Sequence, residues 1–266
     1  MFEKLRRKSL NYVLISILSI SVVLSAISAL TMSKHRSLKL YYSFFVYFQE
    51  DVIGITVRFC INQLIFAYQY AYPCIIAMVY NVLYYDFSEF LFRFHEKLLS
   101  LQKTLNRNEI MVIAKAHCLF FETVHQIQDS TALICFFFLC SQMTVLYGTL
   151  SVFVLTKTED ISVPQICENV LIILLVPASI IRLVLSASRI SEQNKKIQIT
   201  ILVLKDRLIR QSNTDLETVN QLNLMKERQF PVISAAGFAE LSPKFMLSMF
   251  GSLFTYGLLI INLKHE

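Results

Sequence analysis

The sequence predicts an all-α fold, in the form of a polytopic helical membrane protein with five spans. Apolar residues make up 55% of the 266 residues and charged residues only 17%, and the mean hydropathy is +0.53. A chain of this composition cannot hide its apolar surface inside one soluble core. The apolar residues also form long unbroken runs rather than the alternating segments of a membrane β-barrel, so we expect the spans to be helical.

Five runs are long enough and poor enough in charge to cross a bilayer, which takes about 20 apolar residues in a helix. They lie near 10–31, 59–85, 131–155, 169–188 and 244–266. The fourth run contains Pro177 and one charged residue, Arg182. The aromatic run Tyr41–Phe48 is too short to cross a bilayer as a helix, so we interpret it as an interfacial or helix-extending segment.

The distribution of Lys and Arg predicts the orientation of the spans. With a cytoplasmic N-terminus, the inside segments hold seventeen Lys and Arg residues and the outside segments six. Inside segments are normally the richer in positive charge, so the N-terminus is predicted to be cytoplasmic and the C-terminus extracellular. Positive loops beside anionic lipid also account for the formal charge of +6, so no nucleic-acid partner is expected.

The first run has an alternative interpretation as a cleaved signal peptide. A basic stretch, Lys4–Lys8, precedes it, and Ser25–Ala29 offers the small residues of a cleavage site. The apolar part of a signal peptide is only about 7 to 15 residues long. The longer run found here favours a membrane anchor.

The segment 190–243 carries the pattern of amphipathic helices outside the membrane. Four residues recur on one helical face and continue the fourth span: Ile197, Ile201, Leu204 and Leu208. A capping box, Thr214–Glu217, then predicts the start of a second helix, which presents Leu216, Val219 and Leu222 and ends before Pro231. These faces either pack within one subunit or form a cytoplasmic region for subunit assembly, and the sequence leaves both open.

The second span is the best candidate for a ligand cavity. At 100° per residue, four of its residues fall on one stripe: Asn62, Gln69, Tyr80 and Tyr84. Amides that faced lipid would be costly, so the stripe is expected to face other helices or a wet cavity. Hydrogen bonding between helices is the simpler alternative. Pro73 lies near the middle of the span and is expected to kink it.

Enzyme chemistry finds no support in the residue patterns. Glu122 and His125 have the i, i+3 spacing of helical di-iron sites, but such a site needs a second copy, and the sequence has none. There is also no glycine-rich phosphate loop, nucleophile elbow or HExxH motif. We therefore predict that the protein is not an enzyme and has neither a metal site nor a cofactor.

The C-terminal residues carry a specific resemblance. The chain contains Phe230–Phe238, then Leu247–Tyr256, then five apolar residues followed by Asn262 and Leu263. This region resembles the close of the insect gustatory receptor family, within the insect chemoreceptor superfamily of seven-span channels. The family signature is Thr-Tyr, five hydrophobic residues and Gln-Phe at the end of the last span. Thr255, Tyr256 and the spacer match it, whereas Asn262 and Leu263 replace the usual Gln and Phe.

The resemblance implies a ligand-gated, non-selective cation channel that detects small-molecule tastants. It implies four related subunits, as a homo- or hetero-tetramer, in the plasma membrane of sensory neurons. The last helix would line the pore, with Asn262 and Leu263 at its outer gate. Four leucines can close a pore by dewetting, and four amides offer uncharged oxygens to a cation. The alternative is that Thr255 and Tyr256 only pack and that Asn262 caps the helix.

The resemblance also suggests how the chain is divided. Residues 1–189 would form the bundle of the first four spans, 190–243 the cytoplasmic amphipathic helices, and 244–266 the pore-lining helix. The family has seven spans, and the five found here are those that removal of the first two would leave. We therefore expect an N-terminally truncated or reduced member.

A polytopic transporter or carrier subunit is the alternative function. Transporters often show an internal repeat and short, broken helices around a midplane site. Neither feature is evident in this sequence, and five spans do not divide evenly into two halves.

Overall fold

The structure is a computed structural model that describes residues 2–31, 51–104, 106–155, 163–210 and 216–265. Five helices in this part are long and apolar enough to cross a membrane, which confirms the predicted all-α membrane fold. These helical segments are Leu10–Thr31, Val52–Gln102, Arg107–Leu155, Glu168–Arg210 and Pro243–Lys264. The segment Tyr41–Phe48 and the capping residue Thr214 lie outside the described residues.

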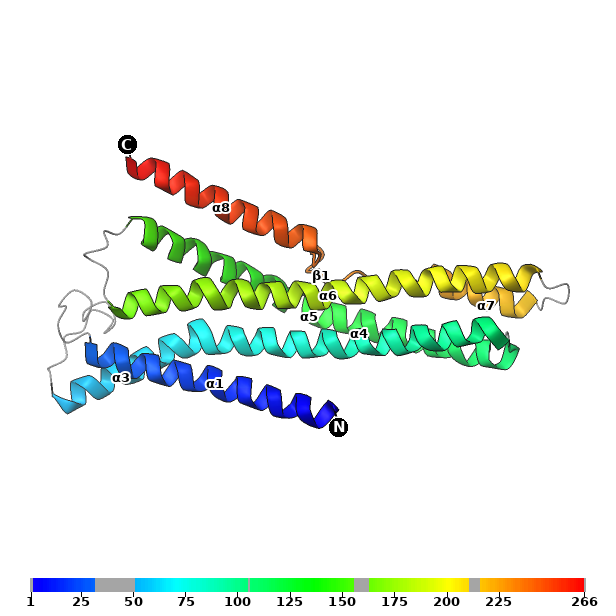
Figure 1. The fold of residues 1–266 in the computed structure, drawn as a ribbon, viewed down its shortest axis with the longest axis horizontal. Helices are drawn as coiled ribbons and strands as arrows, with labels where there is room; N and C mark the ends of the chain where they lie inside the picture. The colour runs from blue at the N-terminus through cyan, green and yellow to red at the C-terminus, as the bar shows by residue number, and fades with distance from the viewer. Residues whose placement is uncertain (1, 32–50, 105, 156–162, 211–215, 266) are drawn as a thin grey trace. The chain divides into compact units, whose positions relative to one another are not determined.

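The elements follow one another along the chain as Figure 1 labels them. The helices are α1 (Phe2–Thr31), α3 (Val52–Phe66), α4 (Tyr72–Thr104), α5 (Arg107–Leu155), α6 (Val163–Arg210), α7 (Leu216–Glu227) and α8 (Pro243–His265). A π-helical segment, η2 (Ala67–Ala71), joins α3 to α4, and two short strands, β1 (Ser234–Ala235) and β2 (Ala239–Glu240), precede α8.

The chain forms two compact units, each with its own packing. Unit 1 comprises 1–79, 141–179 and 251–266, and unit 2 comprises 80–140 and 180–250. Three helices, α4, α5 and α6, begin in one unit and end in the other, as does α8. A unit is therefore a region of packing rather than a stretch of sequence.

The π-helical segment lies immediately before the proline that was expected to kink the second span. The N–H of Tyr72 donates to the carbonyl of Ala67, five residues earlier. Pro73 has no N–H to offer the preceding turn, and wider π turns are one way in which a helix accommodates such a defect. The rotation per residue is therefore not a uniform 100° between Asn62 and Tyr80. The prediction that Asn62, Gln69, Tyr80 and Tyr84 share one stripe assumed this uniform rotation.

Within unit 1, α1 packs along α3 (Figure 1). Gly54, Arg58, Asn62 and Phe66 form the buried face of α3. The side-chain amide of Gln63 donates to the hydroxyl of Ser21 over 3.2 Å. Asp51 caps the start of α3 by accepting from the N–H of Gly54 at 2.7 Å, as N-cap carboxylates do.

Within unit 2, the predicted apolar face of α6 forms part of the core. Ile197, Ile201, Leu204 and Leu208 are all buried, and α6 is one unbroken helix that ends at Arg210. Both findings confirm the helix that the periodicity predicted. Aromatic rings from α4 and α5 extend this core, with the ring centroids of Phe94 and Phe120 5.3 Å apart.

The expected face of α7 is only partly correct. Leu222 is buried, but Leu216 is 74% exposed. The helix buries Thr218, Leu222 and Met225 instead, which lie on one face at i, i+4 and i+7. Leu216 is the first residue of α7 and lies away from that face.

A β-hairpin that the sequence analysis did not predict separates α7 from α8. Ala235 pairs with Ala239, and the N–H of Phe238 donates to the carbonyl of Ala235 at 3.0 Å. Ala236 and Gly237 both have positive φ, at 51° and 74°, as the central residues of a type I′ turn require. Only glycine adopts this conformation without strain.

Two positions one turn apart on α5 hold this hairpin in place. The side-chain amide of Gln128 donates to the carbonyl and hydroxyl of Ser234, at 3.0 and 2.8 Å, and accepts from its N–H at 3.2 Å. The carbonyl of Ala132 accepts from the N–H of Ala236 at 3.0 Å. The Gln128 amide thus satisfies the main chain of Ser234 as a neighbouring strand would.

We predict that Gln128→Leu loosens the hairpin. The substitution leaves the half-buried N–H and carbonyl of Ser234 without this partner, at a cost of about 1–3 kcal/mol in unfolding free energy. The melting temperature in detergent should fall, and the amides of residues 234–240 should exchange hydrogen faster. Gln126→Leu is the control, because Gln126 lies exposed on the same helix. Equal exchange rates in the two variants would contradict the role given to Gln128.

Candidate pore helix and ligand cavity

The residues of the signature motif place α8 against the end of α5 within unit 1. The hydroxyls of Tyr256 and Ser151 are 2.9 Å apart, and those of Ser252 and Tyr147 are 2.8 Å apart. The rings of Tyr147 and Tyr256 meet edge to face, with centroids 4.8 Å apart. Hydroxyl groups thus join the two helices at two successive turns.

The two helices also approach closely at a glycine. A Cβ atom at Gly257 would lie 3.1 Å from Cδ2 of Leu150, so any larger residue would press on that side chain. Nearer the C-terminus, the ammonium of Lys264 donates to the carbonyl of Val154 at 2.6 Å. The contact between α5 and α8 therefore continues almost to the end of α8.

Outside its buried side, α8 has one exposed stripe that is polar and another that is apolar. Met249 and Ile260 are buried and Tyr256 is half-buried, and at 100° per residue the three share one side of the helix. Four exposed residues share the polar stripe: Ser248, Ser252, Thr255 and Asn262. Ser252 lies at its edge, where its hydroxyl also contacts Tyr147 on α5. None of these four is charged. The apolar stripe includes Leu247, Phe254 and Ile261.

Thr255 and Tyr256 are adjacent in the sequence but lie on different faces of α8. Thr255 is exposed and its hydroxyl donates to the carbonyl of Gly251 in its own helix at 3.0 Å. Tyr256 packs against α5. Asn262 is exposed in the last turns of α8, and Leu263 is 61% exposed. Their role as a gate stays a prediction.

The four residues of the predicted ligand cavity fall in both units. Asn62 is fully buried and Gln69 half-buried in unit 1. Tyr80 and Tyr84 are buried in unit 2, with ring centroids 5.8 Å apart. The hydroxyl of Tyr80 donates to the carbonyl of Thr131 at 3.3 Å. That bond joins two helices, so for Tyr80 the structure agrees with the alternative of hydrogen bonding between helices. A ligand cavity formed by Asn62, Gln69, Tyr80 and Tyr84 stays a prediction.

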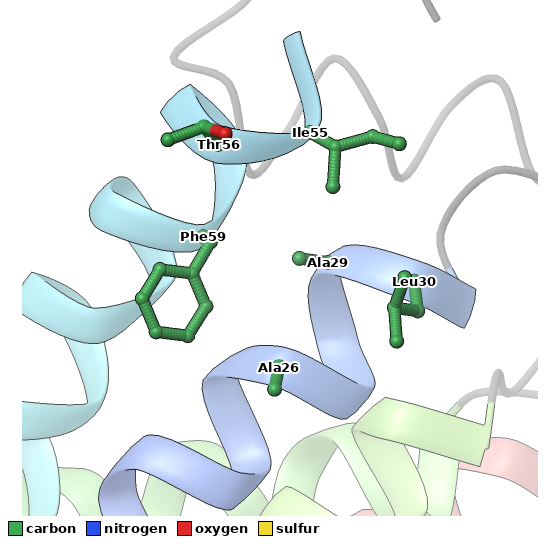
Figure 2. A pocket seen from close by; sticks show the side chains of 6 residues that line it. All are labelled: Ala26, Ala29, Leu30, Ile55, Thr56 and Phe59. Atoms are coloured by element: carbon green, nitrogen blue, oxygen red, sulfur yellow. The ribbon is translucent and has the colours of Figure 1, made fainter. Parts of the chain in front are cut away.

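Unit 1 contains a cavity of about 260 Å³ between α1 and α3, lined by other residues. Figure 2 shows its lining side chains, which are Ala26, Ala29 and Leu30 from α1 and Ile55, Thr56 and Phe59 from α3. The hydroxyl of Thr56 donates to the carbonyl of Val52 at 2.8 Å, so the walls present mainly hydrocarbon. The sequence did carry a signal for this cavity. Its small lining residues, Ala26 and Ala29, belong to Ser25–Ala29, the stretch considered above as a possible signal-peptide cleavage site.

The partners of the signature tyrosine were also missed. Tyr147 and Ser151 lie four residues apart within the third predicted span, and their hydroxyls are the ones that meet α8. Hydroxyl groups at i and i+4 in an apolar run could have indicated a helix contact. Their partner helix could not be identified from spacing alone.

No family model and no curated protein matches the sequence. The structure is similar to that of the insect olfactory receptor OR5 from Machilis hrabei in complex with eugenol, with a TM-score of 0.67 and 16% sequence identity. The similarity covers 98% of this chain and 69% of the receptor. A second structure of the same receptor gives a TM-score of 0.60 at 16% identity, covering 96% of this chain and 67% of the receptor.

These comparisons establish the architecture of the chain. Its described helices are arranged as in an insect olfactory receptor. The similar structures are those of a receptor. The chain therefore shares the fold of the insect olfactory receptors and is a multi-pass membrane protein of that architecture.

Proposed function

We propose that the chain is a subunit of a gustatory-type chemoreceptor, a ligand-gated, non-selective cation channel that detects small-molecule tastants. The observation that carries this proposal is the exposed, uncharged polar stripe of α8, formed by Ser248, Ser252, Thr255 and Asn262. The likeness to an olfactory receptor supports it. The assignment to the gustatory type rests on Thr255 and Tyr256.

The three faces of α8 match the surroundings of a pore helix. One face packs on α5, a second is polar, and a third is apolar. The exposed amide of Asn262 would be costly against lipid, whereas it suits a water-filled pore. The hydroxyls of Ser252 and Thr255 are bonded to Tyr147 and to the carbonyl of Gly251. Four copies of α8 around one axis would each turn the polar stripe inward, with Asn262 and Leu263 at the narrow end.

Exposed apolar residues of unit 2 suit the assembly of such a tetramer. On α6, Ile199 and Ile209 are 61% and 54% exposed, and Leu216 at the start of α7 is 74% exposed. Polytopic proteins leave apolar side chains exposed toward lipid, but this segment follows the predicted fourth span. Contact with neighbouring subunits, identical or related, would cover these side chains.

The proposed topology has a cytoplasmic N-terminus and an extracellular C-terminus, in the plasma membrane of sensory neurons. The excess of Lys and Arg in the inside segments supports it. The gate residues Asn262 and Leu263 then lie at the outer mouth of the pore. A tastant would reach the helices from outside, and the similar olfactory receptor has been solved in complex with a small molecule, eugenol.

We predict that Leu263→Ala raises the basal current of the channel. Smaller side chains widen the apolar ring and let water remain in it, so the closed state should leak several-fold more. The measurement is whole-cell current without ligand, followed by challenge with sugars and bitter compounds. Ile261→Ala is the control, because Ile261 lies on the apolar face of the same turn. If the chain moves a labelled solute without current, the carrier alternative is correct instead.

We also predict that Asn262→Asp changes ion preference. Replacement of the amides by carboxylates would place a ring of negative charge at the pore mouth, which attracts divalent cations more strongly than monovalent ones. The reversal potential in mixed Ca²⁺ and Na⁺ solutions should shift toward that of Ca²⁺, and Asn262→Gln should leave it nearly unchanged. Identical reversal potentials for the Asn262→Asp variant and the wild-type channel would remove Asn262 from the permeation path.

A further inference from the structure

Phe238, in the turn of the β-hairpin, is an aromatic residue that unit 2 leaves uncovered. Its side chain is 83% exposed, and no large apolar residue in the described part of the chain is more exposed. A hairpin turn that faces water normally carries polar residues such as Asn or Asp beside its glycine, whereas this turn contains Ala236, Gly237 and Phe238. Single exposed apolar side chains are common on protein surfaces, so the neighbours of Phe238 decide what it contacts.

The hairpin is fixed on α5 so that Phe238 extends along that helix. Gln128 and Ala132 hold the hairpin main chain, and Phe136 is the next residue on the same i, i+4 face. The ring centroids of Phe238 and Phe136 are 5.5 Å apart. At 1.5 Å per residue, Phe136 lies about 6 Å beyond Ala132 toward the C-terminal end of α5. The ring of Phe238 is therefore directed from the hairpin toward the predicted third span.

This direction leads into the edge of the membrane. The third predicted span covers 131–155, within the apolar helix Arg107–Leu155. A hydrocarbon core takes about 20 helical residues, fewer than the predicted span contains, so Ala132 lies at the boundary and Phe136 one turn deeper. The helix that follows the hairpin, α8, begins at Pro243 and is also long and apolar enough to cross a membrane. The hairpin thus lies at the boundary that both helices cross.

Exposed apolar side chains of α5 continue the surface that Phe238 begins. Leu133 and Phe137 are 57% and 62% exposed and lie one turn apart on one face of the helix. The ring centroids of Phe136 and Phe137 are 5.7 Å apart, so three rings follow one another from α5 to the hairpin. Lys244 is exposed in the first turn of α8, where a long cationic side chain can extend to lipid phosphate groups. Because this apolar surface belongs to a membrane-spanning helix, lipid is the partner that fits it.

We propose that the hairpin is a membrane anchor, in which the ring of Phe238 enters the acyl-chain region of the adjacent leaflet of a phospholipid bilayer. Phe136 and Phe137 support the ring from α5. The proposal rests on the membrane architecture of the chain, and it needs neither channel activity nor a tastant. It takes residues 234–240 out of the cytoplasmic region that the sequence predicted over 190–243.

Such an anchor acts on α8, because the hairpin leads directly into that helix. The N–H of Leu241 donates to the carbonyl of Ile233 at 3.0 Å. This bond closes the base of the hairpin just before Pro243, the first residue of α8. Lipid contact at the tip of the hairpin therefore fixes the depth at which α8 enters the bilayer.

The sequence contains no tryptophan, which allows a single-tryptophan test on the full chain in phosphatidylcholine vesicles. Phe238→Trp places the reporter at the tip of the hairpin, and Phe137→Trp places it on the spanning helix. Thr123→Trp is the control, because Thr123 is exposed on α5 about 20 Å before Phe136 at 1.5 Å per residue.

The measurement is fluorescence quenching by phosphatidylcholine with brominated acyl chains, and by iodide present on both sides of the vesicle. The brominated lipid should quench Phe238→Trp as strongly as Phe137→Trp and several-fold more than Thr123→Trp. Iodide should quench the three variants in the reverse order.

Two results would overturn the proposal. Strong quenching of Phe238→Trp by iodide, with weak quenching by brominated lipid, would place the ring in water. Blue-shifted emission that neither quencher reduces would place the ring against protein, and would assign this surface to a second copy of the chain.

A second pair of variants tests the anchor without tryptophan. Phe238→Ser removes the apolar ring, whereas Phe238→Leu keeps an apolar side chain. In vesicles, the amides of residues 234–240 should exchange hydrogen several-fold faster in Phe238→Ser than in the wild-type chain, and at nearly the wild-type rate in Phe238→Leu. Equal exchange rates in Phe238→Ser and the wild-type chain would mean that lipid contact does not hold the hairpin, and the proposal would then be wrong.

Discussion

The structure depends on three helices that are longer than a bilayer is thick. The helices α4, α5 and α6 contain 33, 49 and 48 residues, which is about 50 to 75 Å at 1.5 Å per residue against a hydrocarbon core of about 30 Å. A helix satisfies its own backbone, so it can leave the membrane without a break. Its apolar face must still be covered. Unit 2 provides this cover, because Ile197, Ile201 and Leu204 are buried within it.

The longest of these helices, α5, also positions α8 at two places. In unit 2, Gln128 and the carbonyl of Ala132 hold the hairpin from which α8 starts. In unit 1, Ser151 contacts Tyr256, and the carbonyl of Val154 accepts from Lys264. All of these are polar groups on one helix. A displacement of either end of α5 would therefore be transmitted to α8 through hydrogen bonds, which are directional and short-ranged.

Unit 1 has buried polar groups that lack hydrogen-bond partners, as unit 2 does. Within its described residues, the buried side-chain atoms without partners belong to Asn62, Gln63 and Gln69, and the π-helical segment falls in the same short stretch. π-Helical turns occur often at functional sites, and unsatisfied buried amides are costly. The buried Arg58 lies in the same stretch, so several polar groups are buried within a few turns of one another here.

The sequence by itself determined the fold class, the number of spans and the buried face of α6, because helical periodicity and apolar length are local properties that neighbouring residues express. Only the tertiary structure decided the features that join distant residues. Gln128 and Ser234 are 106 positions apart, and no local pattern pairs them. The exposure of Leu216, the burial of Arg58 and the cavity between α1 and α3 depend likewise on which helix lies opposite. Tertiary packing decides which helices lie against one another, and no local pattern in the sequence indicates it.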